Sequence, residues 1–90
     1  MNKAEIINHI ASEADISKAE AARSLDAIIG IIKVTLSRGE TVTLVGFGSF
    51  SVSIRSARSG RNPRTGEIIH IKESKIPKFK PGQMLKDIVN

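Results

Sequence analysis

Residues 59–67 read SGRNPRTGE, and this short stretch divides two runs of alternating apolar and polar residues. The run before it alternates serine with larger apolar residues, and the run after it alternates isoleucine with His70 and Lys72. A period of two is typical of β-strands, whereas proline cannot donate to a strand ladder and glycine permits tight turns. The stretch therefore predicts the tip of a long β-hairpin, whose arm runs from about residue 55 to about residue 73.

The predicted arm has no apolar core of its own, because its composition is polar and basic and all three phenylalanines of the chain lie outside it. A two-stranded ribbon is barely stable in water, so we expect the tip to be mobile until another molecule orders it. The cations of the arm and its base are Arg55, Arg58, Arg61 and Arg64 on the entering limb and Lys72, Lys75, Lys78 and Lys80 on the returning limb.

The charge of the chain is concentrated in its second half. Residues 1–45 hold five Lys or Arg against six Asp or Glu, whereas residues 46–90 hold nine against three. Such a basic half suits nucleic acid or an anionic membrane surface, although many small soluble domains are moderately basic. Arginine near the tip favours nucleic acid, since its planar fork can enter a narrow groove and bond two acceptors at once.

Two helices are predicted ahead of the hairpin. Asn2 is a favourable N-cap, and apolar residues at three-and-four spacing continue a helix over residues 3–14. Ser17 and Glu20 form a capping box that begins a second helix, and Gly39 ends it.

From residue 41 the period changes to two. A short strand over residues 41–45 leads through a tight turn at Gly46 and Gly48 into the hairpin, and a last helix covers residues 83–89. The predicted class is α+β, in which a three-stranded antiparallel sheet extends into a β-ribbon arm.

The second helix carries more apolar surface than one stripe requires. Besides its main stripe, Ala27, Ile31 and Val34 fall on its far side, and a helix that is apolar nearly all round is buried nearly all round. A domain this small has little else to cover it, so we expect a dimer, with the sheet covering the second face as the alternative. The residues expected in the core and dimer interface are Leu25, Ile28, Ile29, Ile32, Leu36, Leu44, Phe47, Phe50 and Phe79.

Other kinds of chemistry find little support. The chain has no cysteine, and His9 and His70 have no metal-ligand spacing, so neither a disulfide, a metal nor another cofactor is expected. No nucleophile motif such as G-x-S-x-G and no phosphate-binding glycine loop occurs, so the chain is not expected to be an enzyme. Its first residues include charged and polar ones, which predicts neither an export signal nor a membrane span and suggests a cytoplasmic protein.

Three motifs follow one another along the second half of the chain: Gly46-Phe47-Gly48-Ser49-Phe50, then Arg55 and Arg58, then Gly60-Arg61-Asn62-Pro63-Arg64-Thr65-Gly66. With these motifs the chain resembles the HU and integration host factor family of bacterial DNA-bending proteins, and the resemblance covers the whole chain. The start MNKAEIINHI and the lack of long extensions are more similar to HU, whereas FKPGQ at residues 79–83 is more similar to integration host factor. The expected single domain, residues 1–90, comprises a helical dimerisation part (1–40), the sheet with its arm (41–81) and a C-terminal helix (82–90).

The resemblance implies an intertwined dimer whose two arms embrace DNA through the minor groove. Each arm would insert a proline between base pairs, which here is Pro63, with Arg61, Asn62 and Arg64 beside it. DNA contacts are also expected from Arg55, Arg58, Lys72 and Lys75 on the arm, and from Lys3, Gly46, Ser49, Lys80 and Lys86 on the body. Solvated lysines and turn glycines are the alternative interpretation of the body residues, and Gln83 stands where many HU proteins carry lysine.

The expected function is that of a histone-like protein that binds duplex DNA with low sequence specificity, bends it and compacts the nucleoid. The expected partners are double-stranded DNA, especially bent, nicked or junction DNA, and a second copy of the chain or a paralogue. A sequence-selective bender of the integration host factor type, a helix-turn-helix protein with a protein-docking ribbon, and a binder of structured RNA are the alternatives.

Overall fold

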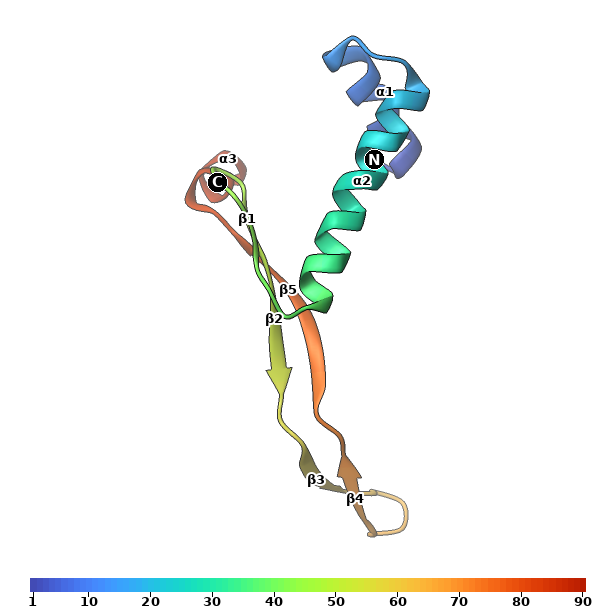
Figure 1. Ribbon diagram of the computed structural model, residues 1–90. Helices are drawn as coiled ribbons and strands as arrows, with labels where there is room; N and C mark the ends of the chain where they lie inside the picture. Colours follow the sequence, from blue (N-terminus) through green and yellow to red (C-terminus); the bar gives the residue numbers. More distant parts are fainter. The chain divides into compact units, whose positions relative to one another are not determined.

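The computed structural model describes residues 1–90, which form two compact units, Met1–Val34 and Thr35–Asn90 (Figure 1). The first unit contains helix α1 (Lys3–Ala14) and most of helix α2 (Lys18–Ser37). The second contains the strands and helix α3 (Gln83–Val89). No helix is both long enough and apolar enough to cross a lipid bilayer. The single-domain expectation stays a prediction.

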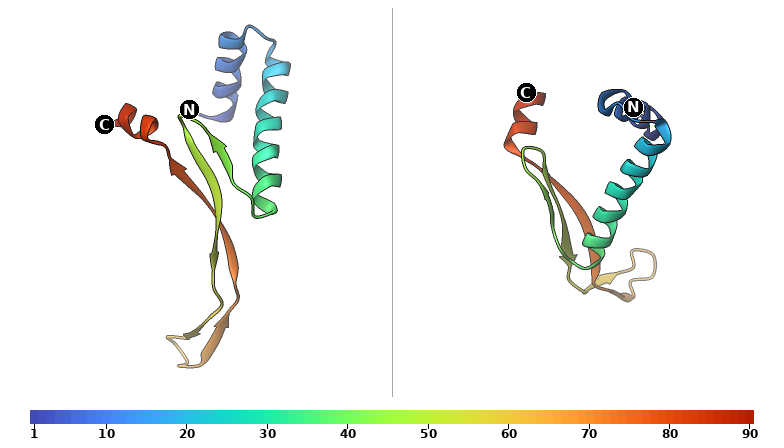
Figure 2. Two further views of the ribbon diagram at one scale, coloured as in Figure 1. Left: turned by 60° about the vertical axis from the view of Figure 1, so that its left-hand side comes forward. Right: turned by 45° about the horizontal axis from the view of Figure 1, so that its top comes forward.

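Local capping fixes both helix starts of the first unit. The Asn2 side chain accepts a hydrogen bond from the Glu5 amide at 2.9 Å. At the start of α2 the Glu20 amide donates to Ser17 Oγ at 3.1 Å, and the Ser17 amide donates to Glu20 Oε1 at 3.4 Å. Each bond satisfies an amide that has no partner inside the helix. The predicted helix starts are therefore confirmed, and the two helices lie side by side (Figure 2).

Asp15 makes the turn between α1 and α2 in a left-handed backbone conformation, with φ 53° and ψ 51°. Its amide and that of Ile16 both donate to the Ala11 carbonyl, so the turn closes the C-terminus of α1. A residue with a β-carbon is sterically strained in this conformation, although aspartate tolerates it better than most residues.

Replacing Asp15 with glycine is therefore expected to stabilise the protein by about 0.5–1 kcal/mol, since glycine adopts a positive φ without strain. Urea unfolding of both proteins at one protein concentration would measure the difference. The matched control is Asp15→Ala, which keeps the β-carbon and should be no more stable than the wild type. A glycine variant that unfolds at or below the wild-type midpoint would contradict the argument.

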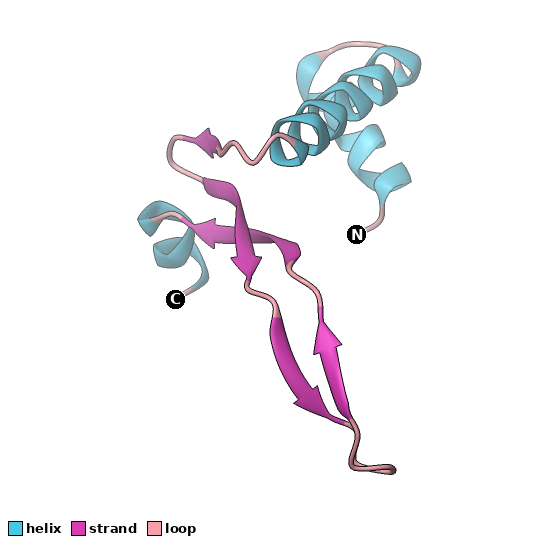
Figure 3. Cartoon of the chain, turned by 60° about the horizontal axis from the view of Figure 1, so that its bottom comes forward, coloured by secondary structure: helices cyan, strands magenta, loops and turns pink.

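The second unit contains a three-stranded antiparallel sheet in the order β1-β2-β5. Its strands are β1 (Val42–Leu44), β2 (Gly48–Arg55) and β5 (Ser74–Pro81). A separate two-stranded sheet is formed by β3 (Arg58–Arg61) and β4 (Ile68–Ile71), which continue the β2–β5 pair (Figure 3). The predicted sheet and ribbon are confirmed. Strand β1 is shorter than the predicted strand over residues 41–45. Helix α2 ends at Ser37, and Gly39, two residues later, adopts φ +75°.

One register runs through the whole hairpin. Arg55 pairs with Ser74 at the end of the body sheet, and Arg58 pairs with Ile71 at the start of the arm. The second pair lies three residues farther along both limbs, so the two sheets share one register. Residues 56–57 and 72–73 between them belong to no strand. The hairpin is consequently one ribbon with a break in its hydrogen bonding.

Strand alternation gives the body sheet two different faces. Directly opposed residues of antiparallel strands point to the same side, and successive residues alternate. One face, the apolar face, carries Val42, Phe50, Val52, Ile54, Pro77 and Phe79, and the other, the serine face, carries Ser49, Ser51, Ser53, Lys78 and Lys80.

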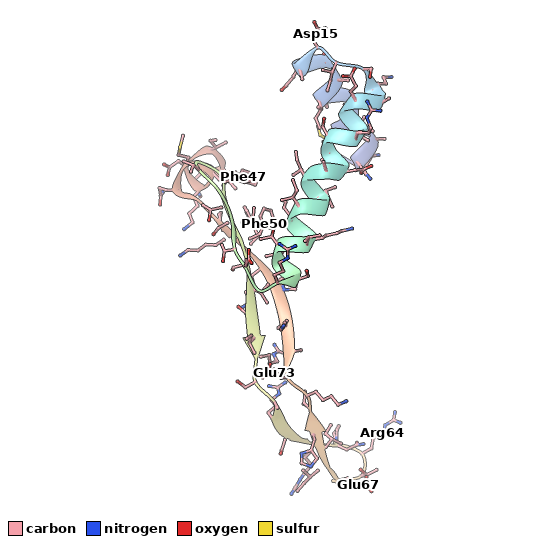
Figure 4. The ribbon with its side chains drawn as sticks, viewed as in Figure 1. Asp15, Phe47, Phe50, Arg64, Glu67 and Glu73 are labelled. Atoms are coloured by element: carbon pink, nitrogen blue, oxygen red, sulfur yellow. The ribbon has the colours of Figure 1, made fainter.

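Three phenylalanines cluster at the base of the sheet. The Phe79 ring lies 4.8 Å from the Phe50 ring and 5.4 Å from the Phe47 ring, measured between centroids. Phe47 and Phe50 are labelled in Figure 4. Gly48 permits this packing, because a β-carbon at that position would lie 2.6 Å from the Lys80 carbonyl oxygen and 2.7 Å from the Phe79 ring. Gly46 instead makes the turn before β2, with φ +82°.

A single chain has almost no interior. Ala21 is the one buried hydrophobic residue, and no large side chain is fully buried. Of the residues expected in the core, Ile28, Leu44, Phe47 and Phe79 remain 41–50% exposed, and the others are only partly buried. A chain that buries so little apolar surface lacks the main favourable contribution to folding.

Candidate nucleic-acid interface

The tip of the arm is a defined turn. The Asn62 amide donates to the Glu67 carbonyl at 2.8 Å, and the Gly66 amide donates to the Asn62 carbonyl at 2.8 Å. Gly66 adopts φ +73°, which explains why glycine stands there. The turn therefore closes the end of the β3–β4 ribbon through its own backbone.

The Asn62 side chain supports the same turn. Its Oδ1 accepts from the Arg64 amide at 2.9 Å, across Pro63. Pro63 is exposed at this apex, and Figure 4 shows Arg64 extending away from the loop. The Pro63 ring is therefore exposed at the end of the ribbon, between Arg61 and Arg64 in the sequence. The hydrogen bond from the Arg64 amide to Asn62 stabilises the loop that carries it. The expectation that the tip is mobile until another molecule orders it stays a prediction. The sequence did not predict the hydrogen bond from the Arg64 amide to Asn62 Oδ1.

The arginines of the arm lie on both faces of the ribbon. Arg58 pairs with Ile71, and Arg61, three residues later on the same strand, pairs with Ile68. Because side chains alternate along a strand, residues three apart have their side chains on opposite faces. The same alternation places Arg55 on the serine face of the body sheet. A spacing of three in a structure of period two thus distributes charge to both sides, which suits a ribbon lying between two rows of phosphates.

No acidic group forms an ion pair with these cations. The one ion pair of the chain joins Lys3 Nζ to Asp26 Oδ1 at 2.7 Å, in the first unit. Arg55, Arg58, Arg61, Arg64 and the lysines of the returning limb make no ion pair, and all are exposed. Their charge is therefore available to an external anion.

The arm also carries a small apolar patch that sequence reasoning missed. A β-carbon added at Gly60 would lie 3.4 Å from Ile71 Cδ1 and 3.6 Å from Ile69 Cγ1. The side chains of both isoleucines therefore pack over Gly60. This contact gives the ribbon some packing of its own, although Ile69 remains 45% exposed. Only the cross-strand register reveals that these residues face one another.

Three expected body contacts lie around one hollow of about 320 Å³. Gly46, Ser49 and Lys80 all line it, together with residues on both sides of the turn before β2. A lysine ammonium, a serine hydroxyl and turn amides are suitable partners for a phosphate. The hollow therefore combines groups that can bind an anion at the base of the sheet.

Lys3, Lys75 and Lys86 are not among the residues that line this hollow. Lys3 is in the other unit and already pairs with Asp26. Lys86 is exposed on α3, and Lys75 is opposite Ile54, on the apolar face of the sheet. Gln83 Nε2 donates to Asp87 Oδ1 at 2.8 Å. The chain contains no group of three or more residues suited to hold a metal ion.

Comparison with known proteins matches the chain from end to end. The family model described as "Bacterial DNA-binding protein" matches residues 1–90. The chain is 54% identical to DNA-binding protein HU-beta of Escherichia coli K12 and 56% identical to that of Serratia marcescens, each over 90 residues that cover all of both chains. An Anabaena HU–DNA cocrystal structure superposes with a TM-score of 0.87 at 40% identity, covering 99% of this chain and 97% of that one. HU from Thermotoga maritima superposes with a TM-score of 0.73 at 36% identity, with both chains fully covered.

Proposed function

The chain belongs to the bacterial DNA-binding protein family over its whole length, with HU proteins among its relatives, and we propose that it bends DNA or stabilises bent DNA as an architectural protein. The observation that carries the proposal is the arm, an exposed cationic ribbon with Pro63 held at its apex and with none of its cations in an ion pair. No catalytic role is proposed. The relatives reported above are HU proteins, which favours HU-like binding over the integration host factor alternative.

The arm would enter the minor groove with Pro63 as the wedge. Architectural proteins of this kind insert an apolar side chain between base steps, partly unstack them and kink the duplex. Pro63 is suited to this role because it is apolar and exposed, and because its turn is held by Asn62. Arg58 and Arg61, on opposite faces of the ribbon, would reach the phosphates of the two strands that border the groove.

The body would hold the DNA on either side of the kink. Bending costs energy, and contacts made only by bent DNA must offset that cost. The hollow lined by Gly46, Ser49 and Lys80 supplies such a contact, and Lys3 and Lys86 are further candidates. Lys3 would first exchange its pairing with Asp26 for a phosphate.

The active form would be a dimer of this chain. The chain alone leaves Ile28, Leu44, Phe47 and Phe79 at 41–50% exposure, and a two-fold interface could bury them. A dimer also supplies two arms, which can clasp one duplex from both sides. The protein would then bind DNA in the nucleoid with little sequence preference, because the minor groove distinguishes little beyond A·T and G·C pairs.

Binding of the purified protein to straight, nicked and four-way-junction DNA at several salt concentrations tests the proposal. Affinity should fall steeply with salt, roughly as the 0.9 power of concentration for each phosphate neutralised, and nicked or junction DNA should bind more tightly than straight duplex. Structured RNA of similar length serves as the competitor. A flat salt response, or equal affinity for every DNA shape, would refute architectural binding.

Replacing Pro63 with alanine is expected to weaken binding to nicked duplex by about tenfold and binding to straight duplex by clearly less. A nick removes much of the unstacking cost, so the wedge contributes most where the duplex is already interrupted. Fluorescence anisotropy on the two duplexes gives the ratio, and Pro63→Leu, which keeps an apolar wedge, is the control. Equal losses on both duplexes would speak against insertion.

A further inference from the structure

His70 is a titratable side chain of the arm to which the proposed function gives no role. It is in the middle of β4, directly opposite Ser59 of β3, and it is exposed. Cross-strand pairing places it on the ribbon face that also carries Arg61 and Ile68. Arg61 is one diagonal step away, a separation of about 7–8 Å between neighbouring strands.

The charged groups around His70 are all cationic. The main contacts of β3 and β4 are with each other, so the groups that can face His70 come from β3 and from its own limb. These are Arg61 on β3 and Lys72, which follows β4. Glu67 and Glu73 lie outside the strands, and His70 forms no ion pair or side-chain hydrogen bond within the chain.

Histidine is the side chain whose charge ordinarily changes between about pH 5 and pH 8. Phosphates brought close by DNA favour the charged form of a histidine. Neutral His70 adds nothing to the charge of this face, and protonated His70 adds a cation beside Arg61. DNA binding and protonation of this residue would therefore reinforce one another.

We propose that His70 is a further phosphate-contact residue of the arm, and that it makes this contact in its protonated form. The inference rests on the proposed DNA-binding function and adds to it a charge that depends on pH. As pH falls, protonation of His70 adds one positive charge to the arm, so affinity for DNA rises. A dimer has two such arms and would take up as many as two protons on binding.

The test measures affinity for one straight duplex at about pH 8 and about pH 6, each over a series of salt concentrations. Wild-type affinity is expected to rise roughly threefold to tenfold at the lower pH, because each exposed charge pair contributes modestly. The logarithmic salt slope should steepen by up to about 0.9 for each histidine protonated. Calorimetry in two buffers of different ionisation enthalpy would measure proton uptake directly.

The chain has two histidines, which provides a matched control. His70→Gln should bind like the wild type at about pH 8 and lose the gain at about pH 6, whereas His9→Gln, in the other unit, should keep it. His70→Arg should bind tightly at both pH values. All other titratable groups are common to the variants, so their contributions cancel in the comparison.

The outcomes separate this inference from the proposed function. Salt-dependent binding that is insensitive to pH, or a pH response that survives in His70→Gln, overturns the role of His70 and leaves architectural binding intact. Absence of DNA binding at both pH values overturns both. Thermal unfolding of each variant confirms that the substitutions, made at exposed positions, leave the fold unchanged.

Discussion

Replacing Arg58, Arg61 and Arg64 together with glutamine is expected to lower affinity for DNA at least about a hundredfold near 0.1 M salt and to flatten its salt dependence. The three side chains are exposed and form no ion pair within the chain, so the substitution removes charge without removing an internal contact. In a dimer with two arms it removes six cations. If all six neutralise phosphates, the logarithmic salt slope should fall by about 5.

The corresponding lysine triple variant separates charge from shape. Lysine keeps the cation but loses the planar fork, so its salt slope should remain near that of the wild type while affinity declines moderately. Anisotropy titrations at four or five salt concentrations would give both quantities for each variant. A glutamine variant that retains the wild-type slope would show that the arm does not bind through its arginines.

Replacing Phe79 with alanine is expected to destabilise the protein by about 3–4 kcal/mol per chain. The Phe79 ring contacts both other phenylalanines, yet it is 41% exposed in the single chain. A loss of this size requires that a second chain cover the ring. If the chain folded alone, the same substitution would cost distinctly less, because much of the ring would already be in contact with water.

Urea unfolding at several protein concentrations, with sedimentation at micromolar concentration, measures this effect. The wild type should sediment as a dimer, and its unfolding midpoint should rise with concentration, because association stabilises the folded chain. Phe79→Leu keeps much of the apolar volume and should lose clearly less stability. A folded monomer with a concentration-independent midpoint would rule out the dimer.

The local parts of this fold follow closely from the sequence. The predicted helix starts at Lys3 and just after Ser17 are those observed, because Asn2, Ser17 and Glu20 supply hydrogen bonds within a few residues. The last helix, Gln83–Val89, also has its predicted bounds. Capping is decided by neighbouring residues, so a single sequence contains the needed information.

The features that the sequence did not reveal depend on pairing across the ribbon. The break at residues 56–57 and 72–73, the packing of Ile69 and Ile71 over Gly60, and the opposite faces of Arg58 and Arg61 all require the register to be known. The site residues at the tip could be named from their resemblance to a family. The bracing of Pro63 by Asn62 became visible only in the structure.

The unbroken register also limits how such arms can change length during evolution. Deleting two residues from each limb would shorten the ribbon and keep every side chain on its present side. Deleting one residue from each limb at the base of the arm would preserve the pairing, but every side chain beyond the deletion would move to the opposite face of the ribbon. Arg58 and Arg61 would then exchange faces. A deletion in one limb alone would force a slip or a bulge. Inherited insertions and deletions in this arm should therefore occur as matched pairs on the two limbs.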